Sequence, residues 1–594
     1  MKFRKRQEPN VLTYNFIDRI LATRGITNFE EYKNPHFEMP DFYSIKNLLK
    51  GIDLVNKHKK SRILIVVDSD TDGYTSGTIF YQFLTRNLPE AEIFYYVHPN
   101  KDHGITDQVK AYVMTMGINF LIVPDAGTND KENTTFLYEH GVEILIVDHH
   151  EKENENPFAV IINNMLDDTN KAYTGAGMSY IFCSALAKEW KLEEPKDLMC
   201  LAAVGNIADG AVLTSNQLRS LCDYGLKNIT NKFLQTIMEN KDIKELTIAD
   251  ISWKIAPIIN GVCRAGNLQE KNLLFKALND IDMEEEHPVS KRKLNKVTRK
   301  YEMVDFVLNG YEYALDILMK CRENQNSGIN PIVEKFSKTI NPNRQIQVFV
   351  LEGVEQNSST GLIANKLSSL SKNPCLVVWE KENTYTGSAR GNTNIMKSFK
   401  DYCTNSGLFE LAQGHDNAFG VILTKENFAK FIQKINSEKF ECQEDTTEYI
   451  VDEIYENGDV NRMHMKEVAD NYHLWCNGCQ EPLFVVKNVI ANKDDIKNYR
   501  GGTLKIYSSG LSFIKYFSKK EEFENIQKGF GDTVTLDIIC KFENNEYNGR
   551  VTQQGVIVDY EIKNQEIIKT EPIIFSDKEL SNIDKQALAF FSCF

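Results

Sequence analysis

The sequence lacks any run of about 20 apolar residues, the length that a membrane-spanning helix requires. Its first six residues are largely basic, but no apolar segment follows them, so we expect no secretory signal. The 12 cysteines are scattered, and several lie inside apolar runs, which is typical of reduced thiols and not of a disulfide framework. We therefore expect a cytoplasmic protein that does not contact membranes.

The chain is also short of positive charge, with 69 Lys and Arg against 83 Asp and Glu and a net charge of −14. A protein with a broad nucleic-acid-binding surface usually has a basic excess. The acidity therefore favours a local groove for a nucleic acid, or a smaller anionic substrate whose charge is met by metal ions. No internal repeat or low-complexity segment is present, and 594 residues predict about three to five domains.

Acidic residues and histidines follow three short apolar runs in the first part of the chain. Residues 63–67 precede Asp68-Ser69-Asp70-Thr71-Asp72-Gly73, residues 120–124 precede Asp125, and residues 142–147 precede Asp148-His149-His150. Apolar runs of about five or six residues, separated by helix-length segments, indicate central strands of a parallel sheet. Because such sheets bind ligands at the carboxyl ends of their strands, we expect these polar side chains to converge.

Clustered carboxylates predict bound cations at this edge of the sheet. Two negative charges about 4 Å apart repel by roughly 4 kcal/mol at an effective dielectric constant near 20. A mixed set of Asp and His ligands favours Mn²⁺ or Mg²⁺. A plain acidic turn remains an alternative for residues 68–73, whereas an EF-hand loop is excluded because Ile79 stands at its twelfth position.

The rest of the chain predicts a modular α/β protein. Residues 290–321 have apolar side chains at helical spacing, residues 346–351 and 375–379 read as strands, and five later runs are spaced like the strands of a small β-barrel. The predicted divisions are a helical cap (1–60), a parallel-sheet domain (61–285), a long connecting helix (286–330), a smaller α/β domain (331–440), a β-barrel (460–565) and a tail (566–594).

The order of these motifs resembles that of the DHH phosphoesterases, in which Asp-x-Asp-x-Asp-Gly, a strand-end Asp and Asp-His-His are followed by a fourth motif, here Ala208-Asp209. More narrowly, the chain resembles the RecJ branch, the exonucleases specific for single-stranded DNA. Residues 387–390 and 414–420 resemble the two motifs of the DHH-associated domain, and the C-terminal strands resemble the OB-fold domain of RecJ proteins. The resemblance implies a parallel-sheet DHH domain, a DHH-associated domain and an OB-like barrel.

The resemblance also implies a role for particular residues. Two divalent cations, Mn²⁺ or Mg²⁺, would be held by Asp68, Asp70, Asp125, His149 and Asp209, with Asp125 as the bridge. The implied catalytic or orienting residues are Asp72, Asp148 and His150. The implied substrate-binding residues are Asn260, Arg264, Ser388, Arg390, Gly414 and His415.

The activity implied by the resemblance is hydrolysis of single-stranded DNA to mononucleotides, in the 5′ to 3′ direction, in DNA repair or recombination. A monomer is expected, with a helicase or a single-strand-binding protein as partner. One alternative is a phosphodiesterase for short oligonucleotides or cyclic dinucleotides, which suits the acidic charge but gives no use for the barrel. The other is a replication scaffold with an inactive DHH fold. The presence of all five expected metal ligands argues against this alternative.

Overall fold

The computed structural model describes residues 1–7, 15–166, 172–294, 299–341, 344–352, 359–393, 395–438, 448–456, 458–499, 502–528, 531–547 and 549–563. These residues divide into two compact units. The larger unit contains residues 8–447 and 473–481, and the smaller contains residues 1–7, 448–472 and 482–594. Across the described residues, no helix has the length and apolar character needed to cross a membrane.

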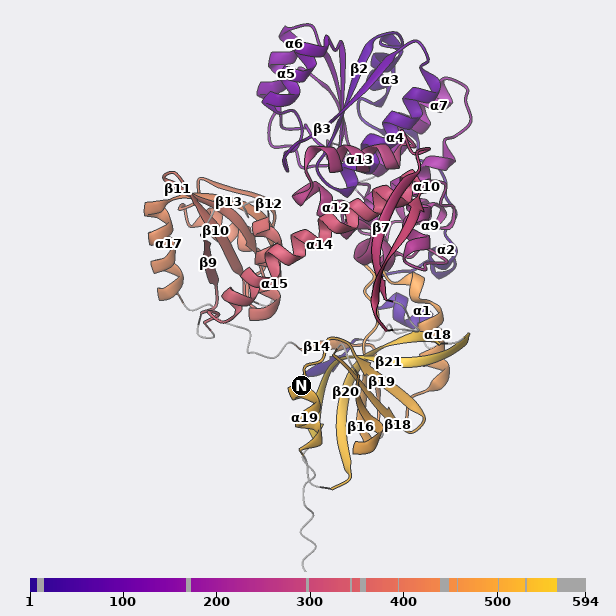
Figure 1. The fold of residues 1–594 in the computed structure, drawn as a ribbon, viewed down its shortest axis with the longest axis vertical. Coiled ribbons are helices and arrows are strands. Elements are labelled where there is room, and N and C mark those ends of the chain that lie inside the picture. Colours follow the sequence, from indigo (N-terminus) through magenta and orange to yellow (C-terminus); the bar gives the residue numbers. More distant parts are fainter. Residues whose placement is uncertain are drawn as a thin grey trace, which may run out of the picture. The chain divides into compact units, whose positions relative to one another are not determined.

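A five-stranded sheet forms the centre of the first half of the larger unit (Figure 1). All its neighbouring strands are parallel, in the order β3 (Glu92–Val97), β2 (Arg62–Val67), β4 (Phe120–Pro124), β5 (Glu143–Asp148) and β6 (Val160–Asn163). The apolar runs of the sequence are thus parallel strands, as predicted. Alternate residues of β2 face two different cores, Ile63 and Ile65 one and Leu64 and Val66 the other, so both faces of the sheet are covered.

Helices cover the two faces of this sheet. Residues of α5 (Asp107–Met116) and α6 (Lys131–Glu139) pack on the smaller core, whereas α3, α4, α7 and α8 contribute to the larger one. Apart from α5 and α6, the helices of this half are α1 (Phe16–Ala22), α2 (Phe29–Lys33), α3 (Leu48–Lys57), α4 (Thr71–Asn87), α7 (Gly175–Glu189), α8 (Met199–Ala208), α9 (Asn216–Lys227), α10 (Lys232–Asn240), α11 (Ile248–Asp250), α12 (Ala256–Ala265) and α13 (Leu268–Leu278).

The connection to the next sheet differs from the predicted helix over residues 286–330. β7 (His287–Leu294) and β8 (Tyr301–Leu308) form an antiparallel hairpin, and the helix α14 begins only at Gly310 and continues to Ser337. The prediction of helix before residue 310 is therefore wrong. Val304, Phe306 and Val307 match a helical spacing, but β-branched and aromatic residues favour strands, and Asn309 with Glu312 forms a capping box that starts the helix.

A second, mixed sheet completes the larger unit, with the order β12 (Leu411–His415), β13 (Ala418–Thr424), β11 (Thr384–Arg390), β10 (Cys375–Lys381) and β9 (Gln347–Leu351). Only β9 and β10 are parallel. The associated helices are α15 (Thr360–Ser371), α16 (Phe399–Asn405) and α17 (Lys425–Ser437). The strands predicted at residues 346–351 and 375–379 are confirmed as β9 and β10.

The smaller unit contains one seven-stranded sheet, in the order β15 (Glu453–Tyr455), β16 (Phe484–Asn492), β20 (Thr533–Tyr547), β21 (Arg550–Lys563), β19 (Leu511–Lys515), β18 (Thr503–Ser508) and β17 (Ile496–Tyr499). It also contains α18 (Arg462–Asp470) and α19 (Lys520–Gln527). Within the part of the chain that the structure describes, the edge strands β15 and β17 do not pair, so the sheet does not close into the predicted barrel. Alternating apolar residues predict strands but not whether the outermost strands meet.

Two further boundaries differ from the predicted divisions. Phe3–Lys5 form strand β1, which pairs with β14 (Tyr449–Val451) in the smaller unit, so residues 1–7 lie outside the helical cap. The strands β14 and β15 lie between the predicted α/β domain, which ends at residue 440, and the predicted barrel, which begins at residue 460. Pairing with distant strands, which local charge does not reveal, decides both cases. The predicted tail, residues 566–594, lies outside the described residues.

Candidate active site

Acidic and histidine side chains from three neighbouring strands meet at one edge of the parallel sheet. Asp68 follows β2, Asp125 follows β4, and Asp148 is the last residue of β5. Within each of three groups, the oxygen or nitrogen atoms able to bind a metal lie within 4.8 Å of one another. The groups are Asp68, Asp70 and Asp125; Asp72, His149 and Asp209; and Asp125, Asp148, His149 and His150.

Asp72 and Asp148 are held by many hydrogen bonds. Asp72 accepts from the Thr174 hydroxyl at 3.0 Å and from the amides of Gly175 and Ala176 at 2.8 and 3.0 Å, at the start of α7. Asp148 accepts from the Thr128 amide and hydroxyl, and from the amides of the two histidines that follow it. With their oxygens occupied in this way, both carboxylates can fix neighbouring ligands in place.

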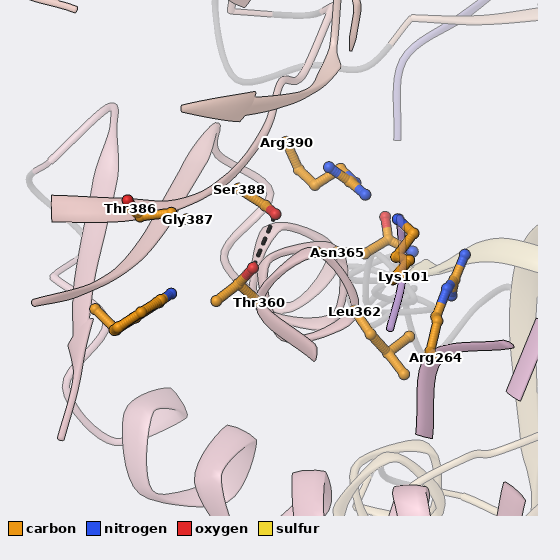
Figure 2. A pocket seen from close by; sticks show the side chains of 11 residues that line it. Lys101, Arg264, Thr360, Leu362, Asn365, Thr386, Gly387, Ser388 and Arg390 are labelled. Atoms are coloured by element: carbon orange, nitrogen blue, oxygen red, sulfur yellow. Dashed lines mark hydrogen bonds between the residues drawn. The ribbon is translucent and has the colours of Figure 1, made fainter. Parts of the chain in front are cut away.

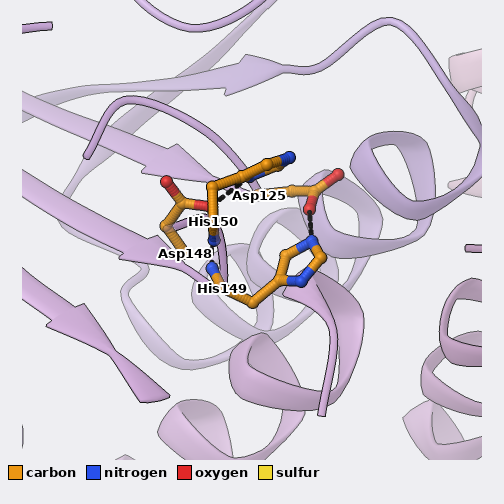
Figure 3. A group of neighbouring side chains, drawn as sticks. All are labelled: Asp125, Asp148, His149 and His150. Atoms are coloured by element: carbon orange, nitrogen blue, oxygen red, sulfur yellow. Dashed lines mark hydrogen bonds and ion pairs between the residues drawn. The ribbon is translucent and has the colours of Figure 1, made fainter. Parts of the chain in front are cut away.

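Asp70 and Asp125 make far fewer hydrogen bonds. Asp70 caps α4 by accepting from the Gly73 amide at 3.0 Å. Oδ1 of Asp125 is buried and accepts no hydrogen bond from the described residues, although it lies 3.2 Å from Nε2 of His149 (Figure 3). A Cβ at position 175 would lie 2.3 Å from this same oxygen, so only glycine fits where α7 approaches Asp125.

Asp209 stands at the C-terminus of α8, and Oδ2 of its partly exposed side chain lies 3.7 Å from Nε2 of His149. Residues 473–481 support the loop that follows it. The Leu213 amide donates to the Asn477 carbonyl at 3.0 Å, and the Asn477 side chain donates to the Gly210 carbonyl. The fourth motif of the predicted set is thus brought to the cluster by a helix end and a supported loop.

The cluster has an excess of negative charge. Burial, together with the charges of Asp72 and Asp70, raises the pKa of Asp125 well above its usual range. Burial and the same two neighbours raise the pKa of Asp209 to about 8. Burial likewise raises the pKa of Asp70, and Asp68 and Asp72 raise it further. A positive charge that joins these carboxyls would lower their raised pKa values and favour the ionised forms.

His150 differs from His149 in both environment and charge. Its Nδ1 lies 2.8 Å from Oδ1 of Asp148, and this hydrogen bond raises the pKa of His150 to about 9. About half of the His150 side chain is exposed, so the ring can meet a ligand from solvent. Burial lowers the pKa of His149, which leaves that imidazole neutral and able to bind a metal.

Sequence reasoning missed His103. Its Nδ1 lies 2.6 Å from Oδ2 of Asp68, and the Gly104 amide donates to Oδ1 of Asp68 at 3.1 Å. Both oxygens of Asp68 therefore already have a partner, unlike Oδ1 of Asp125. The sequence could have indicated His103, because residues 98–106 follow β3, and β3 lies next to β2 in the sheet.

The donor set fits a divalent metal site. An octahedral ion with ligands at about 2.0–2.1 Å places adjacent donor atoms about 3 Å apart, and Asp125 Oδ1 and His149 Nε2 are separated by 3.2 Å. Asp125 belongs to two of the three groups, as expected of a carboxylate that bridges two ions. Bound cations would also satisfy its unpartnered oxygen and offset the repulsion that raises the pKa values.

A cavity of about 420 Å³ is lined by cationic and hydroxyl side chains (Figure 2). It brings together Arg264 of α12, Ser388 and Arg390 of β11, and Lys101, which sequence reasoning missed. No carboxylate of the described residues forms an ion pair with these three cations, and burial and Arg264 lower the pKa values of both Lys101 and Arg390. The Ser388 hydroxyl lies 2.9 Å from that of Thr360. Such a cavity favours an anion.

Three predicted substrate-binding residues lie outside the cavity lining. Oδ1 of Asn260 accepts from the amide and hydroxyl of Thr71, both at 3.0 Å, so Asn260 fixes the start of α4, between Asp70 and Asp72. His415 is exposed at the end of β12, and its charge contributes to lowering the pKa of His149 after burial and His150. Gly414 has a φ of +130°, and a Cβ there would lie 2.8 Å from the Ala418 carbonyl oxygen.

Residues 62–205 match the family model of the DHH family, N-terminal domain. The fold and the site therefore define a DHH-type α/β domain, which contains β2 to β6 and most of the acidic cluster. Asp209 lies just beyond the matched residues.

Beyond this domain, the chain is RecJ-like in sequence and fold, which confirms the resemblance. It is 29% identical over 581 residues to YorK of Bacillus subtilis, a prophage-derived protein named as a single-strand DNA-specific exonuclease. This match covers 92% of this chain and 96% of YorK. It is 23% identical to the Haemophilus influenzae single-stranded-DNA-specific exonuclease RecJ, over 80% of this chain and 84% of the relative. The Mn²⁺ complex of Thermus thermophilus RecJ matches with a TM-score of 0.69 at 18% identity, over 91% of this chain and 75% of that one.

Proposed function

We propose that the protein is a metal-dependent exonuclease that hydrolyses single-stranded DNA to mononucleotides in the 5′ to 3′ direction, in DNA repair or recombination. The observation that carries this proposal is the pairing of two oppositely charged sites in a RecJ-like chain. One is a carboxylate and histidine cluster that needs cations, and the other is a cavity with three cations that needs an anion. A phosphodiester next to a further phosphate suits such a pair.

In this proposal Asp68, Asp70, Asp125, His149 and Asp209 would hold two divalent cations, Mn²⁺ or Mg²⁺. Bound divalent cations supply a lowered pKa for attacking water and charge neutralisation at the phosphate. Asp72 and Asp148 orient the ligand-bearing segments through the hydrogen bonds described above. His150, with its raised pKa of about 9, is protonated at neutral pH and can donate to a phosphate oxygen or to the leaving group.

The cavity lined by Lys101, Arg264 and Arg390 is proposed to hold a phosphate of the substrate's 5′-terminal nucleotide. A terminal phosphate carries about 1.5 to 2 negative charges at neutral pH, more than an internal diester. Ser388 can donate a hydrogen bond to the same group, and Arg390 can bind it in bidentate fashion. The charges of Asp70 and Asp68 act on Lys101, so the cavity borders the acidic cluster. The 5′ to 3′ direction follows the resemblance to RecJ.

The smaller unit is proposed to bind single-stranded DNA as an OB-like module. Tyr499, Tyr507 and Tyr516 are 39–50% exposed, and Phe517 is 92% exposed. Lys505 lies 5.0 Å from the centre of the Tyr507 ring. Exposed aromatic rings with nearby cations provide stacking surfaces for bases without sequence preference. Phe513, in contrast to these four exposed rings, is buried and belongs to the core.

The test is Mn²⁺-dependent release of mononucleotides from 5′-labelled and 3′-labelled single strands, with blunt duplex as a control. We expect immediate release of the 5′ label by the wild type and no release by His149→Ala. The matched control is His140→Ala, which removes an exposed histidine on the far end of α6. First release of the 3′ label would reverse the proposed direction. Cleavage of cyclic dinucleotides alone would replace the proposed substrate.

A further inference from the structure

The β7–β8 hairpin is basic in a chain that is acidic. Between residues 287 and 308 the sequence has six Lys and Arg residues but only two Asp and Glu residues, whereas the whole chain has a net charge of −14. The hairpin pairs with no other described strand, so it forms a two-stranded ribbon of its own. It is labelled by β7 in Figure 1, beside α14. Neither the acidic cluster nor the cationic cavity includes any of its residues.

One face of the ribbon is fixed to α14. The His287 ring stacks on Tyr313 with centroids 4.0 Å apart, and Lys291 Nζ lies 2.6 Å from Asp316 Oδ1. His287 and Lys291 are four positions apart along β7, so they lie on the same face of the strand. These contacts hold the base of the ribbon in place and leave its opposite face directed away from the helix.

The opposite face carries apolar, aromatic and cationic side chains that are open to solvent. Arg292 pairs across the ribbon with Met303, and Tyr301 and Val307 lie on the same face as Met303 by the alternation of β8. Tyr301, Met303 and Val307 are 60–65% exposed. The Arg292 guanidinium lies 4.8 Å from the centre of the Tyr301 ring. Stability does not explain this surface, because an isolated two-stranded ribbon is marginal in water and these side chains bury little.

We propose that this face of the β7–β8 ribbon is a second binding surface for single-stranded DNA, separate from the active site. Bases would stack on Tyr301 and contact Met303 and Val307, and Arg292 and Arg299 would meet the phosphates. The exposed Tyr301 ring beside the Arg292 guanidinium favours this occupant, since aromatic rings beside cations can stack on any base while the cations meet phosphates. The inference rests on the proposed function, because it assumes single-stranded DNA as substrate.

The first test is the affinity of the full-length protein for a long, dye-labelled oligothymidylate in EDTA, where metal-dependent cleavage is suppressed. For Arg292→Glu with Arg299→Glu we expect binding to weaken about tenfold or more, and the salt dependence to fall by about 1.4 for two lost phosphate contacts. Tyr301→Ala should weaken binding about tenfold by loss of stacking. Lys50→Glu with Lys60→Glu makes the same change of charge on and after α3, and it should leave the affinity unchanged.

The second test separates this inference from the proposed function. Hydrolysis of the dinucleotide pTpT in Mn²⁺ should be the same for the ribbon variants and the wild type, which also shows that the variants are folded. Their hydrolysis of long strands at low concentration should fall in step with affinity. Wild-type protein that neither binds nor cleaves DNA would contradict the proposed function itself. Wild-type cleavage together with unchanged DNA affinity in the ribbon variants would overturn the ribbon surface alone, including the case in which the ribbon binds a protein.

Discussion

The acidic cluster and the cationic cavity of the larger unit are opposite in charge, but each is incomplete by itself. In the cluster, burial and like charges raise the pKa values of Asp70, Asp125 and Asp209. In the cavity, burial and a like charge lower the pKa values of Lys101 and Arg390. Each site thus disfavours its own ionised groups until a ligand of the opposite sign binds.

In the proposed function, the two sites divide recognition of one substrate. Metal cations would complete the cluster and bring charge to the bond that is broken, whereas an anion would complete the cavity and place the strand. Loss of a cluster residue should therefore remove chemistry and metal binding together. Loss of a cavity residue should reduce substrate binding and leave metal binding unchanged.

The largest effect is expected for Asp125→Asn. Because Asp125 lies in two groups of donors, the variant should lose activity by about a thousandfold or more, equivalent to several kcal/mol of lost charge stabilisation. The rise in melting temperature on adding Mn²⁺ should also disappear. The metal-free variant should be at least as stable as the wild type, because the amide cannot ionise beside Asp70 and Asp72, whose charges disfavour an ionised Asp125. Asp107→Asn, at an exposed aspartate of α5, is the matched control. Full activity of Asp125→Asn would contradict the assignment.

A smaller loss is expected for Arg390→Ala in the cavity. We expect kcat/KM on single-stranded DNA to fall about a hundredfold, as when one charged donor to a phosphate is removed. The Mn²⁺-induced rise in melting temperature should equal that of the wild type. Steady-state kinetics on 5′-phosphorylated and 5′-hydroxyl strands measures both parts, and the loss should be greater with the phosphate. Equal losses on the two strands would show that the cavity does not hold the terminal phosphate.

Asp148→Asn should have a moderate effect, because Asp148 acts through its neighbours. Loss of a residue that orients metal ligands typically lowers activity about 10- to 100-fold. The same substitution removes the carboxylate that raises the pKa of His150 to about 9. The alkaline limb of the pH–rate profile should therefore move toward neutral pH. A uniform fall in rate at every pH would show that Asp148 does not act through His150.

The smallest effect is the pH dependence of metal-free stability. The folded-state pKa of Asp209, about 8, lies above its ordinary value of 3.8, so the folded protein binds more protons than the unfolded chain between these values. The raised pKa of His150, about 9 against 6.5, acts in the same direction. Stability from these groups should therefore fall as the pH rises from 6.5 to 8.

Thermal unfolding in EDTA measures this slope, and Asp209→Asn should flatten it. Mn²⁺ holds the carboxylates ionised, so its stabilisation should increase over the same range, to about 2.7 kcal/mol at a hundredfold excess over Kd. A slope that Asp209→Asn leaves unchanged would show that other groups cause it.

The sequence predicted the acidic cluster well because two simple rules apply there. A parallel strand buried on both faces has a continuous apolar run, and its carboxyl end is where polar side chains meet. Asp68, Asp125 and Asp148 follow such runs, and the structure places them together. Applied to β3, whose sequence is half polar, the same rule would also have found His103 and Lys101.

Other features depend on contacts that local sequence does not contain. The β7–β8 hairpin was predicted as helix because its apolar spacing continues into α14, and only the pairing of two exposed strands separates the two states. Asn260 was expected to bind substrate, but its contact with Thr71 depends on how α12 packs against α4. The apolar runs of the sequence predicted strands β16 and β18 to β21, but they did not predict the edge strands β15 and β17.

The most direct test of the paired sites is a crystal structure of the full-length protein with Mn²⁺ and a short 5′-phosphorylated oligothymidylate, using Asp148→Asn to slow cleavage. We expect two ions about 3.5–4 Å apart, both bound by Asp125, and the terminal phosphate between Lys101, Arg264 and Arg390. A strand bound with its 3′ end in that cavity, or ions that do not contact Asp125, would contradict this expectation.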